Sequence, residues 1–399
     1  MLKFIVQLSL RYKWTVVIAA LLVLSYGLYR TYRVKLDVFP EFAPPIVTVQ
    51  TEAPELSSLE VEQLVTIPIE TALAGSPEMD FIRSQSIQGL SYIIVTFKEQ
   101  ADIYRARQVI AERLAEISGK LPQGVEAPKM GPLVGSTCSI LSIGLTSTNR
   151  SLMEIRTYAE WTLRPYLMSV PGVAKVDIFG GDVQQLQIKV KPDMLLKYKV
   201  SLTDIINSAN QATVIRGAGF IDGKNQRMII RTEGQAITPE QMASVPIILP
   251  DGRRLLLKDV ADVEWGVEPK AGDGLINGEK GVILLISSQL GANTLEVTAN
   301  VENALKSISS QVAAMGVELH KRLFRPANFI EYALNGIRHS LTSSAILVAI
   351  VLLLFLLKLR TALISFIAIP LSLLSAVIVL DYFNITINTF TLGGFAIAI

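Results

Sequence analysis

Hydrophobic positions follow two different patterns along the 399-residue chain. Near the start and in about the last sixty residues they form uncharged runs, whereas the middle shows alternating and helical spacing. The runs are Trp14–Tyr29, Leu341–Leu357 and Thr361–Leu380, followed by a further uncharged stretch from Tyr382 to Ile399. A helix of about 20 apolar residues spans the hydrocarbon core of a bilayer. The pattern therefore predicts membrane helices at both ends of the chain, around a soluble block.

The first run is shorter than a bilayer, but Lys13 and Arg30 at its ends can reach the polar interfaces. A signal peptide is the alternative reading of this run. No small-residue cleavage pattern follows it, and its aromatic end is typical of a membrane exit. For the two later runs the alternative is a pair of buried core helices. Their connection, Lys358 to Arg360, is short and basic, which favours membrane helices.

The short basic loop also predicts the orientation, because basic residues concentrate in cytoplasmic loops. With Lys358 and Arg360 inside the cell, the helix before them starts outside, and the first helix crosses from inside to outside. The soluble block, about Arg33 to Ile330, is then expected outside the cytoplasm. In a bacterium with two membranes this compartment is the periplasm.

The soluble block begins with a unit of strand, helix, two strands and helix. Alternating polar and apolar residues predict strands at Ile46–Gln50, Phe81–Ile87 and Tyr92–Phe97. Helices are predicted at Ser57–Leu73 and from the capping residue Asp102 to about Ser118. This order is that of a split β-α-β-β-α-β, ferredoxin-like unit. Such a sheet buries one face beneath its two helices and can pack its other face on a neighbour.

A second unit repeats this order with additional segments. It begins with a predicted strand at Ser139–Thr146 and a predicted helix at Leu152–Ser169. A hairpin follows, with strands Val173–Phe179 and Gln185–Val190 around the turn Gly180-Gly181-Asp182. The next predicted helix is Ser201–Ala212. Further strands are predicted at Met228–Thr232, Val245–Leu249 and Val282–Gln289, before another helix capped by Asn293 or Thr294. The extra segments predict an inserted hairpin that projects from the block and contacts another subunit.

Composition excludes several classes of function. Charged residues make up 18% of the chain, against about 25% in a typical soluble protein. The net charge of +2, without a long basic run, argues against a nucleic-acid partner. The single cysteine allows no disulfide within the chain, and neither C-x-x-C nor H-E-x-x-H occurs. No nucleophile has a visible base partner, so the sequence predicts a non-enzyme with no cofactor and no catalytic, cofactor-binding or metal-site residues.

A few residue groups invite a chemical role but have a simpler explanation. Glutamates 52, 55, 60, 62 and 70 are expected to spread over a solvated face. Methionine thioethers bind soft metals, but Met79, Met130, Met153, Met168, Met194, Met228, Met242 and Met315 are scattered and are expected mainly in cores. Cys138 is expected to be a small core residue. His320 shows no ligand partner in sequence. Asp381 ends the third apolar run and is interpreted as an interfacial anchor.

Several motifs together resemble one family. They are D-V-F-P-E-F-A-P-P-I-V-T-V-Q-T-E-A-P at Asp37–Pro54, V-E-Q-L-V-T-I-P-I-E at Val61–Glu70, V-P-G-V-A-K-V-D-I-F-G-G at Val170–Gly181, G-A-N-T-L-E-V at Gly291–Val297 and N-T-F-T-L-G-G-F-A-I-A-I at Asn388–Ile399. The chain resembles the resistance-nodulation-division (RND) efflux permeases of AcrB/AcrD/AcrF type. Within them it is most similar to the heavy-metal cation efflux branch of CusA/CzcA type.

The resemblance implies a homotrimeric, proton-driven pump of the inner membrane that exports metal cations or drugs. It implies a periplasmic adaptor and an outer-membrane channel protein as partners, besides the lipid bilayer. Family members are longer, and their proton-relay aspartates lie just past the glycine pair matched by Gly393 and Gly394. The chain is therefore expected to be an N-terminal fragment that ends inside a fourth membrane helix, and no functional residue is carried over. The stretch F-R-P-A-N-F-I at Phe324–Ile330 departs from the family pattern Y-D-x-S.

The expected organisation is an α+β membrane protein, with transmembrane helices flanking a periplasmic porter domain of ferredoxin-like subdomains. Its parts are an N-terminal transmembrane helix (1–36), a first porter subdomain (37–137), a second with the docking hairpin (138–330), and helices two, three and the start of four (331–399). Residues 37–330 are expected in the periplasm. Alternatives are a membrane-anchored periplasmic ligand-binding receptor, and an RND relative that exports lipids or aids secretion.

Overall fold

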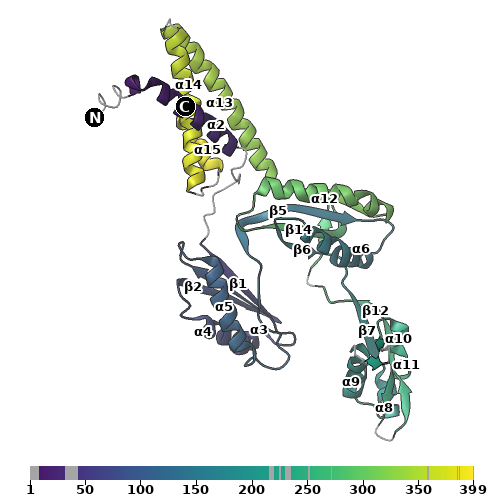
Figure 1. Ribbon diagram of the computed structural model, residues 1–399. Coiled ribbons are helices and arrows are strands. Elements are labelled where there is room, and N and C mark those ends of the chain that lie inside the picture. Colours follow the sequence, from purple (N-terminus) through teal and green to yellow (C-terminus); the bar gives the residue numbers. More distant parts are fainter. Residues whose placement is uncertain are drawn as a thin grey trace. The chain divides into compact units, whose positions relative to one another are not determined.

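The computed structural model of the chain describes residues 9–31, 44–214, 220–223, 226–229, 235–249, 252–270, 272–356, 359–383, 385 and 387–398. It divides into two compact units. Unit 1 comprises Met1–Leu145, Leu163–Ile178 and Ile283–Ile399, and unit 2 comprises Thr146–Thr162 and Phe179–Val282. Mixed helices and antiparallel sheets make this an α+β structure (Figure 1).

The first sheet in unit 1 has the strand order β2-β3-β1-β4. Its strands are β1 (Ile46–Glu52), β2 (Met79–Ile87), β3 (Leu90–Phe97) and β4 (Lys129–Met130). The helices are α3 (Ser58–Val61), η1 (Glu62–Thr66) and α4 (Ile67–Leu73), which are continuous, and α5 (Ile103–Ser118). This is the split β-α-β-β-α-β connectivity, with every predicted strand and helix at its expected place.

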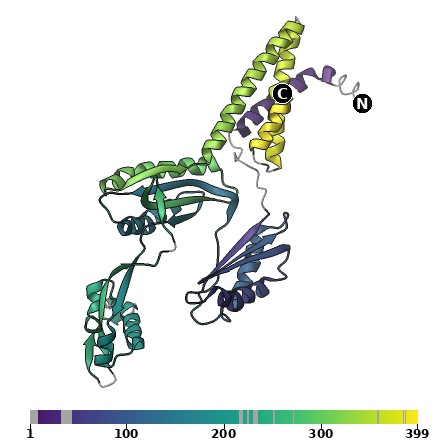
Figure 2. The ribbon, with the colours of Figure 1, turned by 180° about the vertical axis from the view of Figure 1, so that it is seen from behind.

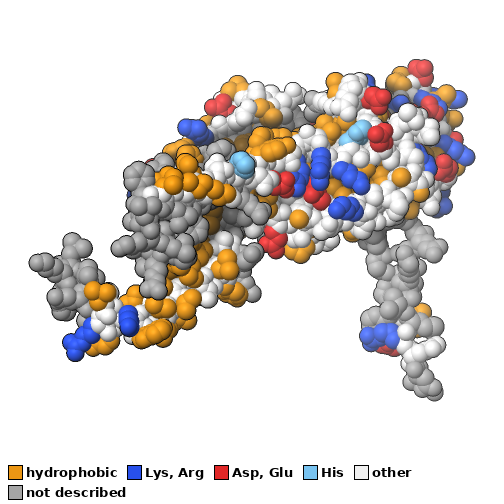
Figure 3. All heavy atoms as spheres, turned by 90° about the horizontal axis from the view of Figure 1, so that it is seen from above, with side chains coloured by type: hydrophobic (Ala, Val, Ile, Leu, Met, Phe, Trp, Pro, Cys, Tyr) orange, Lys and Arg blue, Asp and Glu red, His pale blue; other side chains and the backbone are white. Residues whose placement is uncertain are grey.

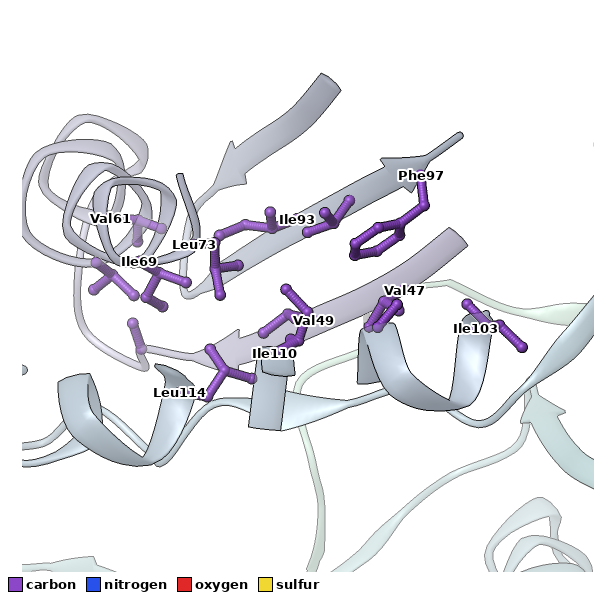
Figure 4. Packing of buried hydrophobic residues seen from close by; sticks show 14 residues of the cluster. Val47, Val49, Val61, Ile69, Leu73, Ile93, Phe97, Ile103, Ile110 and Leu114 are labelled. Atoms are coloured by element: carbon purple, nitrogen blue, oxygen red, sulfur yellow. The ribbon is translucent and has the colours of Figure 1, made fainter. Parts of the chain in front are cut away.

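The core of this sheet lies between its strands and helices. Inward side chains of β1 and β3, such as Val49 and Ile93, are fully buried against Leu73 of α4 and Ile110 of α5 (Figure 4). Burying such a side chain stabilises the fold by roughly 1.5–3 kcal/mol. Arg113 of α5 adds a polar tie, because its guanidinium donates hydrogen bonds to the carbonyls that end α4.

The second sheet has the order β13-β14-β5-β15, and β6 also pairs with β14. The strands are β5 (Val134–Thr146), β6 (Val173–Phe179), β13 (Gly274–Ile276), β14 (Glu279–Gln289) and β15 (Glu318–Phe324). The helix of α6 (Leu152–Tyr158), η2 (Ala159–Leu163) and α7 (Arg164–Met168) follows β5, and α12 (Thr294–Ala314) follows β14. Read as β5, helix, β6, β14, α12 and β15, this sheet repeats the connectivity of the first.

The predicted hairpin of Val173–Phe179 with Gln185–Val190 is wrong. Strand β6 pairs with β14 in the sheet, whereas β7 (Gln184–Val190) pairs with β12 (Ala261–Val267). The predicted helix at Ser201–Ala212 is α9 (Leu202–Thr213), and it belongs to the insertion rather than to the repeat. The second helix of the repeat is α12. The insertion therefore begins earlier than the sequence suggested, by the predicted strand that is β7 and the predicted helix that is α9.

Two glycines, Gly180 and Gly181, explain why the chain leaves the sheet after β6 instead of forming a hairpin. Gly180 and Gly181 have φ angles of +72° and +75°, which favour glycine. A Cβ atom on Gly180 would lie 2.5 Å from the nitrogen of Gly274 and 2.6 Å from the oxygen of Gly281. A Cβ atom on Gly181 would meet Val282 and Arg156. The two glycines thus form a close crossing of backbones where the insertion leaves the sheet, and not a hairpin turn.

The insertion in unit 2 has its own core. Besides β7, α9 and β12 it contains α8 (Pro192–Tyr198), β8 (Phe220–Asp222), β9 (Arg227–Ile229), α10 (Pro239–Ala243), β10 (Pro246–Ile248), β11 (Arg254–Leu256) and α11 (Leu257–Val260). Ile247, Leu257 and Val260 are fully buried there. Strands β8 and β9 form a hairpin. The predicted strand Met228–Thr232 overlaps β9, and its residues 230–232 lie outside the described residues.

The apolar runs form helices, as predicted. They are α2 (Lys13–Thr31), α13 (Ala327–Leu356), α14 (Leu359–Tyr382) and α15 (Thr389–Ala398). Within the described part of the chain, length and composition qualify one helix, α2, to cross a membrane, and a shorter apolar helical segment covers Pro370–Tyr382. Leu22 of α2 and Leu354 of α13 are about two-thirds exposed. Figure 3 shows an elongated surface of mainly hydrophobic side chains, and charged side chains gathered elsewhere in the view.

The glycine crossing leads to a first prediction. A left-handed conformation costs an L-residue about 1–2 kcal/mol. Gly180→Ala should destabilise unit 2 by more than this, because the backbone atoms of Gly274 and Gly281 must also move. Gly278→Ala is the matched control, since Gly278 has φ +90° but open space around it. Urea unfolding of the two purified variants measures the difference. Equal losses of stability would show that the crossing is not tight.

Candidate functional site

Helices α2 and α14 pack closely, and Gly27 sets their separation (Figure 2). Gly27 is the buried residue of α2, and a Cβ atom at this position would lie 2.7 Å from Cβ of Leu374 and 3.3 Å from its carbonyl oxygen. Small residues at such contacts let apolar helices approach until their side chains interlock. The glycine therefore allows a contact that a larger residue would prevent.

An ion pair lies one turn beyond Gly27. Nη2 of Arg30 on α2 is 2.5 Å from Oδ2 of Asp381 on α14, and the two side chains are 36% and 23% exposed. The guanidinium also lies over the ring of Tyr26, 5.7 Å from its centre. This partner explains how a basic residue can stand at the outer end of the first apolar run. Asp381 thus ties the end of α14 to α2.

The contact of α2 with α14 leads to a second prediction. Gly27→Ala should lower the thermal stability of the chain in detergent, by about 1–3 kcal/mol, as overpacking typically does. Gly336→Ala on α13 is the control, because a Cβ atom there meets nothing within 4 Å. Alanine is the better helix former by about 1 kcal/mol, so this control should be neutral or stabilising. A loss of stability in both variants would contradict the role of Gly27.

The last described helix begins with a well-formed cap. Oδ1 of Asn388 accepts hydrogen bonds from the backbone of Phe390 and Thr391, and Oγ1 of Thr391 accepts one from the backbone of Asn388. Such reciprocal bonds satisfy backbone donors that a helix start leaves free. Gly393 and Gly394 follow, and neither would place a Cβ atom within 4 Å of a neighbour. Packing of the described residues therefore does not require this glycine pair.

A cluster of charged residues lies where the second sheet meets α13. Glu302 on α12 accepts hydrogen bonds from Arg322 on β15 (2.8 Å) and from Arg325, which follows this strand (3.0 Å). Arg325 also donates to Asn328 (2.7 Å) and Glu331 (2.9 Å) on α13. The side chain of Arg325 is 9% exposed and that of Glu302 15%. The cluster connects α12, the end of β15 and the first turns of α13.

This arrangement shifts the pKa values of Glu302 and Arg325. Burial alone raises the pKa of Glu302, but the hydrogen bonds and charges of Arg325 and Arg322 outweigh it. The pKa of the carboxyl therefore lies below its ordinary value of 4.5. In Arg325 the pKa is raised, first by the hydrogen bond to Glu331, then by Glu302 against the effect of burial. Each group holds the other in its charged form.

The lowered pKa leads to a third prediction, on acid stability. A carboxyl whose pKa falls on folding stabilises the fold above its unfolded pKa, and this contribution disappears as the pH falls through the folded pKa. Wild-type chain should therefore lose stability below about pH 4.5 more steeply than Glu302→Gln. Thermal unfolding of both proteins between neutral and acidic pH measures the difference. Parallel pH profiles would contradict a contribution of Glu302.

Apart from Arg30, Asp381 and the pair Gly393 and Gly394, the residues considered from sequence lie away from these features. Glu52, Glu55, Glu60 and Glu62 are exposed, and Glu60 closes a capping box with Ser57. Cys138 is half-buried on β5, and Nε2 of His320 on β15 lies 3.9 Å from Glu318. Within the described part of the chain, no group of three or more His, Cys, Asp or Glu residues is placed to hold a metal ion.

The methionines are distributed among cores and surfaces. Met79 and Met130 pack on the first core, while Met194 and Met242 belong to the core of the insertion. Met168 is 42% exposed, and the side chain of Met228 lies outside the described residues. Sequence reasoning missed both Gly27 and the cluster around Arg325. The departure of F-R-P-A-N-F-I from the family pattern was the one signal that pointed to the latter.

The described residues combine long apolar helices with an α+β block of antiparallel sheets. A model of the AcrB/AcrD/AcrF family matches residues 5–399, so the chain belongs to this family. Protein HelA of Legionella pneumophila is 32% identical over 99% of this chain and 38% of its own length. The cobalt-zinc-cadmium resistance protein CzcA of Cupriavidus metallidurans is 30% identical over 98% of this chain and 37% of its own.

A crystal structure of a heavy metal efflux pump has the same fold. It superimposes with a TM-score of 0.85 at 28% sequence identity, covering 96% of this chain and 39% of the pump. The expected family and its heavy-metal branch are thereby confirmed. The chain spans less than two-fifths of the length of the relatives it matches.

Proposed function

We propose that this chain is the N-terminal part of a proton-driven RND transporter that exports metal cations across the inner membrane. The likeness to the heavy metal efflux pump structure carries the proposal, because it covers nearly the whole chain. Relatives named for cobalt, zinc, cadmium and nickel resistance support metal cations over drugs as substrates. A membrane-anchored receptor has less support, since the chain belongs to a transporter family.

The proposal assigns a place to each part of the chain. Residues 1–36 form the first transmembrane helix, and residues 331–399 form the second and third helices and the start of the fourth. Residues 37–137 and 138–330 form two porter subdomains in the periplasm. The β8–β9 hairpin of the insertion lies in the second subdomain and is the element that would dock. Trimer formation, an adaptor and an outer-membrane channel protein complete the proposed assembly.

The described residues also bear on how metal ions would be handled. Within them no group of three or more His, Cys, Asp or Glu residues suits an ion, and the methionines are divided among separate cores and the surface. The proposal therefore places ion binding and proton relay in parts of the assembly beyond these residues. Residues 1–399 would supply the membrane anchor and the porter scaffold. The alternative of an RND relative that exports lipids or aids secretion shares this scaffold.

Deleting the coding region of this chain in its host provides the fourth prediction. Deleted cells should accumulate more cobalt, zinc, cadmium or nickel than the parent, because export is lost. Elemental analysis of washed cells measures the content, and a panel of organic dyes and drugs serves as the comparison. If the accumulation of all four metals is unchanged and that of the organic compounds rises, the substrates are drugs rather than metal cations. No change in either group would contradict an efflux function.

Proton coupling requires a separate measurement. In the parent strain, a protonophore should raise metal accumulation to the level of the deleted strain, since it removes the gradient that drives exchange. It should have little further effect on the deleted strain. An equal protonophore effect in both strains would contradict proton-driven export through this protein.

A further inference from the structure

The link between the second sheet and α13 consists of Arg325 and Pro326. Strand β15 ends at Phe324 and α13 begins at Ala327. The backbone turns directly into the helix, with the amide of Asn328 bonded to the carbonyl of Arg325 and that of Phe329 to the carbonyl of Pro326. Ala327 and Ile330 are buried. The helix then continues to Leu356, over roughly 45 Å at 1.5 Å per residue.

We propose that Arg325 is an electrostatic clasp that locks the first turns of α13 onto α12, so that the long helix and the second sheet move as one rigid body. The clasp acts through the planar guanidinium, which reaches both helices at once. Nε and Nη2 face Glu302 on α12, while Nη1 binds Asn328 and Nη2 binds Glu331 on α13. A lysine could not make this fork of bonds.

Burial distinguishes Arg325 from an ordinary surface pair. Its side chain is 9% exposed, whereas that of Arg322, which binds the same carboxylate, is 62% exposed. Exposed ion pairs contribute little, but removing one partner of a buried pair leaves an uncompensated charge. Arg322 comes from β15, and its hydrogen bond leads to Glu302 on α12. The two arginines therefore share Glu302, whereas Arg325 also donates hydrogen bonds to Asn328 and Glu331 on α13.

The clasp would have a mechanical consequence. A helix clamped only at a flexible loop can pivot, whereas one clamped by a two-residue link and a buried fork of hydrogen bonds cannot. Tilting of the far end of α13 would then displace α12 and its sheet together. Arg325 is a positioning residue in this proposal and contacts no substrate. The proposal holds whether or not the protein exports metals, since it concerns the joint alone.

The test measures the distance between α12 and α13 by spin-label spectroscopy on the full 399-residue chain in detergent. Labels are attached at Lys306→Cys on α12 and Asn335→Cys on α13, both exposed, in a Cys138→Ser background. The otherwise unchanged chain should give a single narrow distance. Arg325→Met should lose it, because α13 can then pivot. Arg322→Met is the matched control and should keep it, although it removes the same charge from the same carboxylate.

Glu331→Lys guards against misfolding of Arg325→Met. Glu331 is about half exposed, so its replacement should leave the fold intact while placing a repelling charge beside Arg325. This variant should also lose the narrow distance, with circular dichroism unchanged. Retention of the narrow distance in Arg325→Met or in Glu331→Lys would overturn the proposal. An equal loss in Arg322→Met would overturn it as well, because the effect would then be one of net charge.

Discussion

The direct passage from strand β15 into helix α13 sets the direction in which this long helix leaves the second sheet. Because Pro326 fixes its own φ angle and Arg325 is held by hydrogen bonds, the strand end dictates the direction of the helix. The helix carries the apolar run that starts at Leu341, so a water-soluble sheet orients a segment suited to lipid. No cluster of exposed charges could fix this direction as well, because surface ion pairs are weak and screened by salt.

The two sheets show how a duplicated fold retains a backbone feature while its side chains differ. In both, the first helix contains a π turn, Glu62–Thr66 or Ala159–Leu163, followed by Pro68 or Pro165 at the same spacing. Proline lacks an N–H group and collides with the carbonyl four residues earlier, and a wider turn relieves this collision. The proline, rather than any side-chain contact, thus accounts for the bulge.

Side chains at the bulges support this conclusion. Thr66 is buried, and its hydroxyl bonds Ser86 and Ser91 at 2.8 Å each. At the equivalent position of the second helix, Leu163 is 1% exposed and apolar. A polar network and a hydrophobic contact therefore occupy the same backbone geometry. The chemistry of the buried side chain thus differs between the repeats, while the backbone bulge is the same.

Local periodicity predicted the long helices and most strands of the two sheets, because it reflects which side chains face the core. It missed strands β12 and β15 and the short helices α8, α10 and α11. It could not predict which strands pair. Val173–Phe179 and the next strand along the chain looked like a hairpin, but β6 pairs with β14 about a hundred residues later. The two glycines between them are typical of a turn and equally of a close backbone crossing, and only the surroundings decide. The departure of F-R-P-A-N-F-I from the family pattern marked the stretch around Arg325, but its contacts could not be predicted, since its partners come from two other elements.

The ion pairs on the β7–β12 ribbon and the pair of Arg325 with Glu302 differ mainly in exposure, and exposure decides what they contribute. On the β7–β12 ribbon, Lys189 pairs with Glu264 and Lys191 with Asp262, but the side chains are 41–64% exposed. Pairs of this kind contribute about 0–1 kcal/mol, so the buried Val260 and Leu257 hold the insertion together. Around Arg325 the same chemistry is largely shielded from water. There the loss of one partner leaves a buried charge without compensation. The connection between β15 and α13 is therefore sensitive to single substitutions.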